Sequence, residues 1–67
     1  MNPIKKYRLE NGITQAELAD KLGTTPHAVS QYETGKRVPN VKIGPKLSSL
    51  LGCSVEDIRQ QMKEAAE

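Results

Sequence analysis

The chain has 67 residues, a formal net charge of +2 and a single cysteine, Cys53. This length allows one domain with one modest core, and residues 61–67 are expected to form a frayed tail. A lone cysteine excludes an internal disulfide and a cysteine-based zinc site, so a cytoplasmic location is expected. No apolar run approaches the roughly 20 residues of a membrane-spanning helix, and residues 1–12 lack the apolar centre of a signal peptide.

Charge is distributed unevenly along the chain. Residues 1–46 contain eight Lys or Arg side chains and four acidic ones, a balance of +4, whereas residues 47–67 have a balance of −2. A basic body with an acidic tail suits an anionic partner on one side of the molecule. Ordinary solvated surface charge is the alternative explanation.

Helix start and stop signals are frequent and strand patterns are missing, so an all-α fold of five helices is predicted. The first helix is expected to start at Asn2 as N-cap, with a proline in its first turn, and to end around residue 11. Three side chains are assigned to its inner side: Ile4, Tyr7 and Leu9.

A second helix begins at residues 14–17, TQAE, which form a capping box. Its apolar stripe consists of Leu18, Ala19 and Leu22. Gly23 is expected to end the helix in the left-handed conformation.

The third helix follows almost without a loop, with Thr25 as cap and Pro26 at the first helical position. Val29, Tyr32 and Glu33 are predicted to share one side of it, and Gly35 to end it. The other positions are predicted to face elsewhere: Pro26, His27, Ser30, Gln31 and Thr34.

Residues 36–44, KRVPNVKIG, are interpreted as a basic loop in which Ile43 packs inward. Pro45 opens a fourth helix that buries Leu47, Leu50 and Leu51 before Gly52 ends it. Residues 54–57, SVED, cap a fifth helix, with Val55, Ile58 and Met62 apolar at spacings of three and four residues.

Two short helices joined by a tight turn cross steeply only where small residues let their backbones approach. Ala19 faces the turn, Gly23 permits the positive φ angle, and Val29 fills the angle between the helices. Residues 15–34 therefore have the pattern of a helix-turn-helix.

This pattern resembles the helix-turn-helix domains of lambdoid-phage repressors and Cro proteins, and of their bacterial relatives. The resemblance covers roughly residues 3–60. It is carried by residues 13–19 (ITQAELA), 22–25 (LGTT), Glu33, Gly35, Lys36, Pro39, 45–47 (PKL) and 50–55 (LLGCSV). It implies a compact five-helix repressor-like domain that binds double-stranded operator DNA, usually as a two-fold dimer.

The resemblance also implies roles for single residues. Gln15 would touch the DNA backbone and brace the reading helix, as suits the positive end of a helix; the alternative is an exposed first-turn residue. Arg8 and Glu33 match a family pair that joins the first helix to the end of the third. The pair is taken as mainly structural, with Arg8 also able to reach phosphate.

Phosphate contacts supply affinity without sequence information. They are expected from side chains at the start of the third helix and around the next turn: Thr25, Thr34, Lys36, Arg37, Lys42 and Lys46. Each lysine taken alone has solvated surface as its alternative.

The third helix is the predicted reading surface, because an α-helix enters the major groove with its N-terminal side chains against base edges. Gln31 would pair with adenine, Ser30 would reach a base or a phosphate, and Pro26 or Ala28 would touch a thymine methyl. His27 would donate to guanine or phosphate, depending on its protonation. As the only histidine, His27 is not expected to bind a metal.

Pro26 departs from the family pattern, in which a base-reading glutamine often stands at this position. Proline offers no side-chain hydrogen bond, so the operator is expected to differ and discrimination to move toward His27 and Gln31. The alternative is that Pro26 only rigidifies the start of the helix.

Dimer contacts are expected from residues 51–58 and from the basic loop at residues 38–41. Val55, Ile58 and Met62 have the alternative of being ordinary core, in which case the protein is monomeric in solution and pairs only on DNA.

Two functions remain open at this stage. The first is a sequence-specific transcriptional repressor of the Cro type, without cofactor. The second is a protein-interaction module of the same fold, such as an antitoxin or a regulator-binding domain. Enzymatic function is not expected, because no nucleophile-base set, metal cluster or phosphate-binding loop is found in the sequence.

Overall fold

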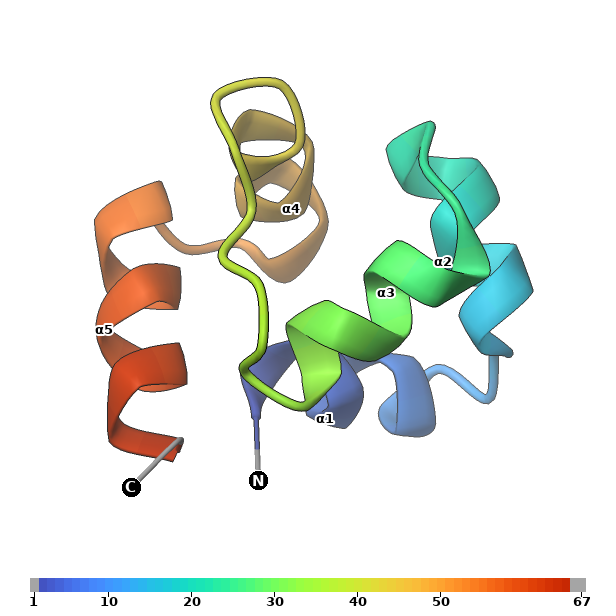
Figure 1. Cartoon of the computed structure of the whole chain (residues 1–67), viewed down its shortest axis with the longest axis horizontal. Helices are drawn as coiled ribbons and strands as arrows, with labels where there is room; N and C mark the ends of the chain where they lie inside the picture. Colours follow the sequence, from blue (N-terminus) through green and yellow to red (C-terminus); the bar gives the residue numbers. More distant parts are fainter. Residues whose placement is uncertain (1, 66–67) are drawn as a thin grey trace.

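The computed structural model of the chain describes residues 2–65, with side chains as far as residue 62. This part of the chain forms five helices: α1 (Pro3–Glu10), α2 (Gln15–Leu22), α3 (Pro26–Glu33), α4 (Gly44–Leu51) and α5 (Val55–Ala65) (Figure 1). The predicted all-α fold is confirmed. The molecule measures 25 × 21 × 20 Å along its principal axes.

Local capping chemistry sets the start of the first three helices. The Oδ1 of Asn2 accepts from the backbone N–H of Ile4 at 2.7 Å. The hydroxyl oxygen of Thr14 accepts from Glu17 N at 3.0 Å, and the Glu17 carboxylate accepts from Thr14 N at 3.1 Å, which completes the predicted capping box. Thr25 caps α3 through a bond from Ala28 N at 3.1 Å. These helix starts are therefore encoded by residues within a few positions of each other.

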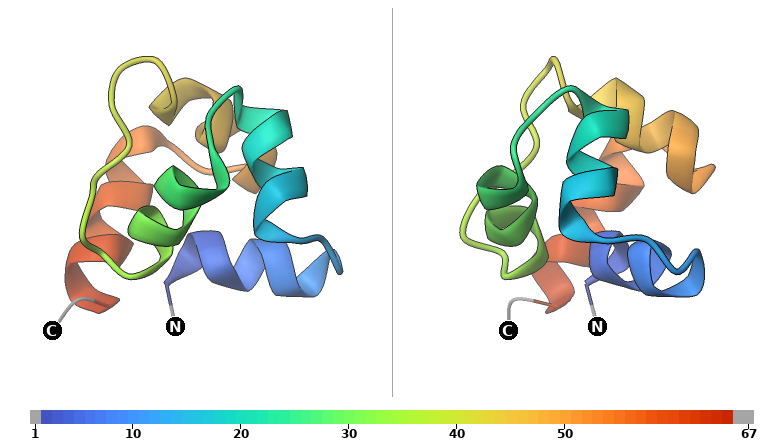
Figure 2. Two further views of the ribbon diagram at one scale, coloured as in Figure 1. Left: turned by 45° about the vertical axis from the view of Figure 1, so that its right-hand side comes forward. Right: turned by 90° about the vertical axis from the view of Figure 1, so that its right-hand side faces the viewer.

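Helices α2 and α3 cross at a steep angle, as the helix-turn-helix prediction requires. In the right-hand view of Figure 2, α3 is seen nearly end-on while α2 runs along the picture. Gly23 has φ 71° and forms the left-handed end of α2. Ala19 and Val29 are buried where the two helices meet. Because a bulkier side chain at position 19 would push the backbones apart, the small residue permits this approach.

All five helices contribute to one hydrophobic core. Its buried members are Ile4, Leu18, Ala19, Leu22, Ala28, Val29, Tyr32, Ile43, Leu47, Ile58 and Met62. Helix α1 packs against α3 and α5, α2 against α3, and α4 against α5. Leu50 and Leu51, which were predicted to be buried with Leu47, pack against this core and are partly buried.

Leu9 does not lie on the inner side of α1, contrary to the prediction, and is 50% exposed. Ile4 is fully buried and sets the inward direction of the helix. At about 100° per residue, position 9 lies about 140° around the helix from position 4, so it turns away from the core.

The fourth helical region begins earlier than predicted. The Oδ1 of Asn40 accepts from Lys42 N at 2.9 Å and from Ile43 N at 3.0 Å, and Gly44 N donates to Asn40 O at 2.8 Å. A capped turn over residues 40–43 thus leads directly into α4. Pro45 has no N–H to continue this bonding to the carbonyl of residue 41, which separates the turn from the helix.

Helix α5 is continuous to Ala65, and Met62 is buried, so residues 61 and 62 belong to the packed domain and not to a frayed tail. Residues 66 and 67 of the predicted tail lie outside the described residues. Within the described part of the chain, no helix has the length and apolar character needed to cross a membrane.

Candidate nucleic-acid interface

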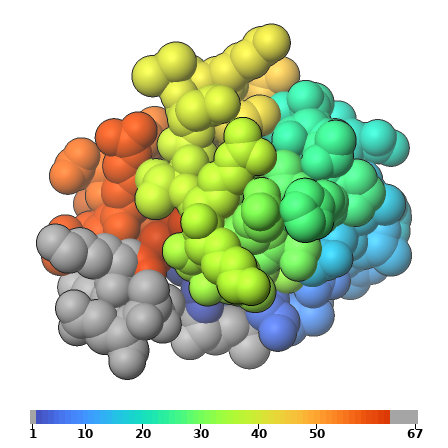
Figure 3. Space-filling model, viewed as in Figure 1, coloured from blue at the N-terminus to red at the C-terminus, as the bar shows by residue number. Residues whose placement is uncertain are grey.

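The exposed side of α3 carries most of the predicted base-reading residues. Pro26 and His27 are exposed, and Ser30 and Gln31 are half-buried. Figure 3 shows α3 in green and the segment after it in yellow-green to yellow across the middle of one face of the molecule, with the yellow part protruding. The helix and the basic segment are therefore accessible from the same side.

Ala28 lies in the core, so the prediction that it contacts a base is wrong. Only 3% of this residue is exposed. Ala28 lies four positions before the buried Tyr32, and residues at this spacing share one face of a helix. The methyl group therefore packs inward and cannot reach a thymine.

Arg8 and Glu33 form the expected ion pair between α1 and the end of α3. Arg8 Nε donates to Glu33 Oε2 at 2.6 Å and Nη2 donates to Oε1 at 3.2 Å, while Nη1 donates to the carbonyl of Ile13 at 3.2 Å. The side chains are only 16% and 4% exposed. The hydrogen bond that Arg8 donates to Glu33 raises the pKa of Arg8, and the negative charge of Glu33 adds to this effect, so Arg8 remains charged over the whole physiological range.

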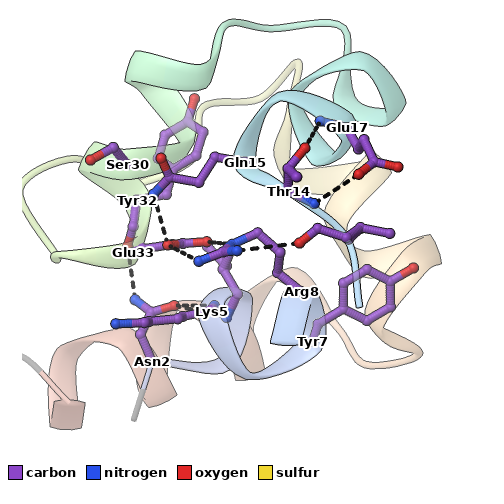
Figure 4. A network of polar contacts seen from close by, with 12 residues as sticks. Asn2, Lys5, Tyr7, Arg8, Thr14, Gln15, Glu17, Ser30, Tyr32 and Glu33 are labelled. Carbon is purple, nitrogen blue, oxygen red and sulfur yellow. Dashed lines mark hydrogen bonds and ion pairs between the residues drawn. The ribbon is translucent and has the colours of Figure 1, made fainter. Parts of the chain in front are cut away.

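Gln15 connects this pair to α2. Its Nε2 donates to Glu33 Oε1 at 3.1 Å, a bond that joins the start of α2 to the helix predicted to read DNA (Figure 4). Gln15 lies in the first turn of α2, where backbone N–H groups have no partner within the helix. Glu33 thus links α1, α2 and α3, and the start of α2 is held in a fixed position relative to α3.

The phosphate-binding candidates differ in whether their polar groups already have partners within the protein. The hydroxyl of Thr34 donates to the carbonyls of Ser30 at 3.1 Å and Gln31 at 3.2 Å, so its proton is used within α3. The hydroxyl oxygen of Thr25 accepts a backbone bond and keeps its proton for a ligand. Arg37 lies over the ring of Tyr32, with Cζ 5.9 Å from the ring centroid, and this restricts its position.

The lysine candidates Lys36, Lys42 and Lys46 are exposed, on three different segments after α3. The Lys46 ammonium approaches Gly23 closely, at 3.0 Å from where a Cβ of that residue would lie. It therefore lies beside the turn between α2 and α3, whereas Lys36 follows the end of α3 directly.

An open hollow of about 650 Å³ lies between the end of α1 and the starts of α2 and α3, and its lining includes Arg8, Leu9, Gln15 and Pro26. It places the apolar ring of Pro26 beside the polar start of α2. No group of three or more His, Cys, Asp or Glu side chains among the described residues could hold a metal ion.

Sequence reasoning missed one polar contact to α3. The Nδ2 of Asn2 donates to the carbonyl oxygen of Tyr32 at 2.8 Å. The cap at Asn2 was predicted because capping is local, but the second bond joins residues 30 positions apart, for which a single sequence gives no signal.

The comparisons with known proteins agree with this geometry. A family model described as "Helix-turn-helix", of the Cro/C1 type, matches residues 4–58. No solved structure matches the chain significantly.

Curated relatives come from all three domains of life. An uncharacterised HTH-type transcriptional regulator of Methanocaldococcus jannaschii is 37% identical over 57 residues, which cover 85% of this chain and 86% of that protein. The SPbeta prophage-derived uncharacterised HTH-type transcriptional regulator YonR of Bacillus subtilis is 42% identical over 79% of this chain and 49% of its own length. Multiprotein-bridging factor 1c of Arabidopsis thaliana is 41% identical over 73% of this chain and 33% of its own length.

The chain thus spans half or less of the prophage and plant proteins and most of the archaeal one. With the family match over residues 4–58 and the crossed pair α2 and α3, the chain belongs to the Cro/C1-type helix-turn-helix family of transcriptional regulators, a family of DNA-binding proteins.

Proposed function

We propose that this protein is a sequence-specific, Cro-like repressor that inserts α3 into the major groove of a palindromic operator. The observation that carries the proposal is the fixed geometry of the two helix starts. The start of α3 is capped and exposed, and Gln15 at the start of α2 is tied to Glu33 at the end of α3. A major groove about 12 Å wide accommodates one helix while a neighbouring helix start meets the phosphate backbone.

Base reading is assigned to the accessible residues of α3. Gln31 is suited to two hydrogen bonds with an adenine, His27 to donation toward a guanine, and Ser30 to either a base or a phosphate. Pro26 contributes an apolar surface beside the hollow at the start of α2, which suits a thymine methyl. Ala28 has no part in this set because it is buried.

Phosphate contacts are assigned to groups that flank the reading helix on both sides. Gln15 and Thr25 lie at the two helix starts, and Lys36 and Arg37 follow the end of α3. Arg8 and Thr34 are weaker candidates, since Glu33 holds the guanidinium and α3 itself holds the hydroxyl proton. Two more basic residues lie further along the chain: Lys42 and Lys46.

A two-fold pair of chains on DNA completes the proposal, because two half-sites one helical turn apart need two reading helices. Ile58 and Met62 are buried in the chain's own core, so they are removed from the candidate dimer surface. Val38 and Val41 are exposed, Val41 to 88%. These two valines and the partly buried Leu51 and Cys53 are the side chains we assign to the contact between the two copies.

Selection of bound duplexes from a random pool tests this function. A palindromic consensus whose half-sites are one helical turn apart is expected, with affinity that falls steeply as salt is raised. Enrichment of no sequence, together with weak and salt-independent binding, would reject it.

A second candidate is a protein-interaction module, and one observation favours it. Several relatives are named multiprotein-bridging factors, and one of them is 41% identical over 73% of this chain. On this alternative, the exposed side of α3 or the loop with Val38 and Val41 would contact a protein. A single stoichiometric protein partner, combined with failure of the duplex selection, would support the alternative.

A further inference from the structure

Asn2 is a buried polar residue whose side-chain amide oxygen and nitrogen both form hydrogen bonds. It is 7% exposed. Its Oδ1 caps α1 by accepting from Ile4 N at 2.7 Å and Lys5 N at 3.4 Å, and its Nδ2 donates to Tyr32 O at 2.8 Å. One side chain thus connects the first turn of α1 to the last turn of α3, as the close view in Figure 4 shows.

The carbonyl of Tyr32 lies in the last turn of the reading helix, α3, and accepts a bond from the turn that follows. This turn folds back onto α3: Gly35 N donates to Tyr32 O at 3.3 Å, and Lys36 N and Arg37 N donate to Gln31 O at 2.9 and 3.2 Å. The Arg37 guanidinium also rests over the Tyr32 ring. Gly35, directly before the two cations, is therefore bonded to the carbonyl that Asn2 holds, and the backbones of Lys36 and Arg37 are bonded to the carbonyl one residue earlier in α3.

Asn2 is one of two polar attachments between α1 and the last turn of α3. The other is the Arg8–Glu33 pair, which uses the opposite end of α1. Helix α3 is also held by its apolar packing and by the bond from Gln15 to Glu33. The two attachments at opposite ends of α1 add directional constraints at the end of α3, since hydrogen bonds are directional.

We propose that Asn2 is a positioning residue for DNA binding. By holding the Tyr32 carbonyl, Asn2 sets the turn from which Lys36 and Arg37 reach the phosphates beside the groove. The inference rests on the proposed function, because it concerns the affinity of these two cations for DNA. Asn2 itself does not contact the nucleic acid in this arrangement.

Asn2→Ser separates the two roles of the side chain. Serine caps a helix about as well as asparagine does, but a hydroxyl that caps α1 is too short to reach the Tyr32 carbonyl. Asn11→Ser is the matched control, because Asn11 Nδ2 donates to Tyr7 O at 2.8 Å at the other end of the same helix and is exposed. Asn2→Asp keeps the cap, replaces the donor with an acceptor, and serves as a second variant should the serine variant fail to fold.

Two measurements test the proposal on the full chain. In amide hydrogen exchange without DNA, Asn2→Ser is expected to accelerate exchange at Gly35, Lys36 and Arg37 about fivefold, the effect of losing one hydrogen bond. In binding to the selected duplex, the slope of log affinity against log salt is expected to fall by about one to two units, as for the loss of one or two phosphate contacts. Asn11→Ser is expected to change neither quantity.

An unchanged salt slope in folded Asn2→Ser would overturn the inference, whether or not exchange accelerates, and so would unchanged exchange at all three amides. Failure of the proposed function gives a different result, because the wild-type chain would then bind no duplex in a salt-dependent way. The exchange measurement needs no DNA and still decides whether Asn2 holds the turn.

Discussion

The helices within each half of the molecule, α1–α3 and α4–α5, are joined by different kinds of interaction. Across α1, α2 and α3, polar side chains cross from one helix to another, from Asn2 to Tyr32 and from Arg8 and Gln15 to Glu33. Between α4 and α5 the contact is mainly apolar, through side chains such as Leu47, Ile58 and Met62. Apolar burial stabilises without fixing direction, whereas hydrogen bonds fix direction. The comparison teaches that polar contacts fix the orientation of α1, α2 and α3 relative to one another, whereas α4 and α5 are attached mainly by apolar packing.

The largest effect is expected from Glu33→Ala, which breaks the polar links of the first half at their centre. Removal of one partner of a largely buried ion pair costs about 3–5 kcal/mol, because Arg8 remains buried without its counter-charge. Equilibrium denaturation measures this loss. Glu17→Ala, which removes an exposed carboxylate of the same half, is the control and is expected to cost much less. Equal losses for the two variants would contradict the special role of Glu33.

Leu47→Ala tests the second half. Leu47 is fully buried in α4, and its truncation is expected to cost about 2–5 kcal/mol of folding free energy. Operator affinity per folded molecule is expected to stay near the wild-type value, since α4 carries none of the side chains assigned to base reading. The control for folding stability alone is Val41→Ala at an exposed position, which is expected to leave the free energy of unfolding nearly unchanged. Loss of affinity in fully folded Leu47→Ala would show that the second half also orients the interface.

Gln31→Ala tests base reading by the exposed side of α3. The variant is expected to lose about 1–3 kcal/mol of discrimination at one base pair of the operator, because the two bonds to adenine are removed. Binding to duplexes varied at each position measures this loss. Gln61→Ala, an exposed glutamine on α5, supplies the matched control. The same loss at every position would rule out a base-reading role.

The smallest effect is expected from Lys36→Ala, which removes a single phosphate contact. Affinity should fall for all sequences alike, and the salt slope should decrease by about one unit. Lys6→Ala on α1 is the comparison variant, with an unchanged slope. If both lysine variants behave the same, Lys36 is solvated surface and does not contact DNA.

Most of the fold could be predicted because its signals are local. The capping box at residues 14–17, the proline at the start of α3 and the glycine at position 23 each act within one helical turn. The predicted start of α4, Pro45, lies only one residue after the observed start, Gly44. The turn capped by Asn40 before this helix was not expected. Local chemistry therefore accounts for the helices and for the tight turn between α2 and α3.

The interface was harder to predict because its geometry depends on distant pairs. The Arg8–Glu33 pair, 25 positions apart, was anticipated only through the family resemblance, and the Asn2–Tyr32 bond was not anticipated at all. Ala28 was assigned to the wrong side of α3 because its small size suits both a core and a groove. Its spacing of four from Tyr32 was the available sign of burial.

Amide chemical-shift mapping of the labelled protein with the selected duplex tests most directly whether α3 and the start of α2 face the DNA. The largest changes are predicted at Gln15, at residues 25–31 and at residues 34–37, with little change on the outer side of α5. Changes centred on α4 and α5, with residues 26–31 unaffected, would contradict the assignment of α3 as the reading helix.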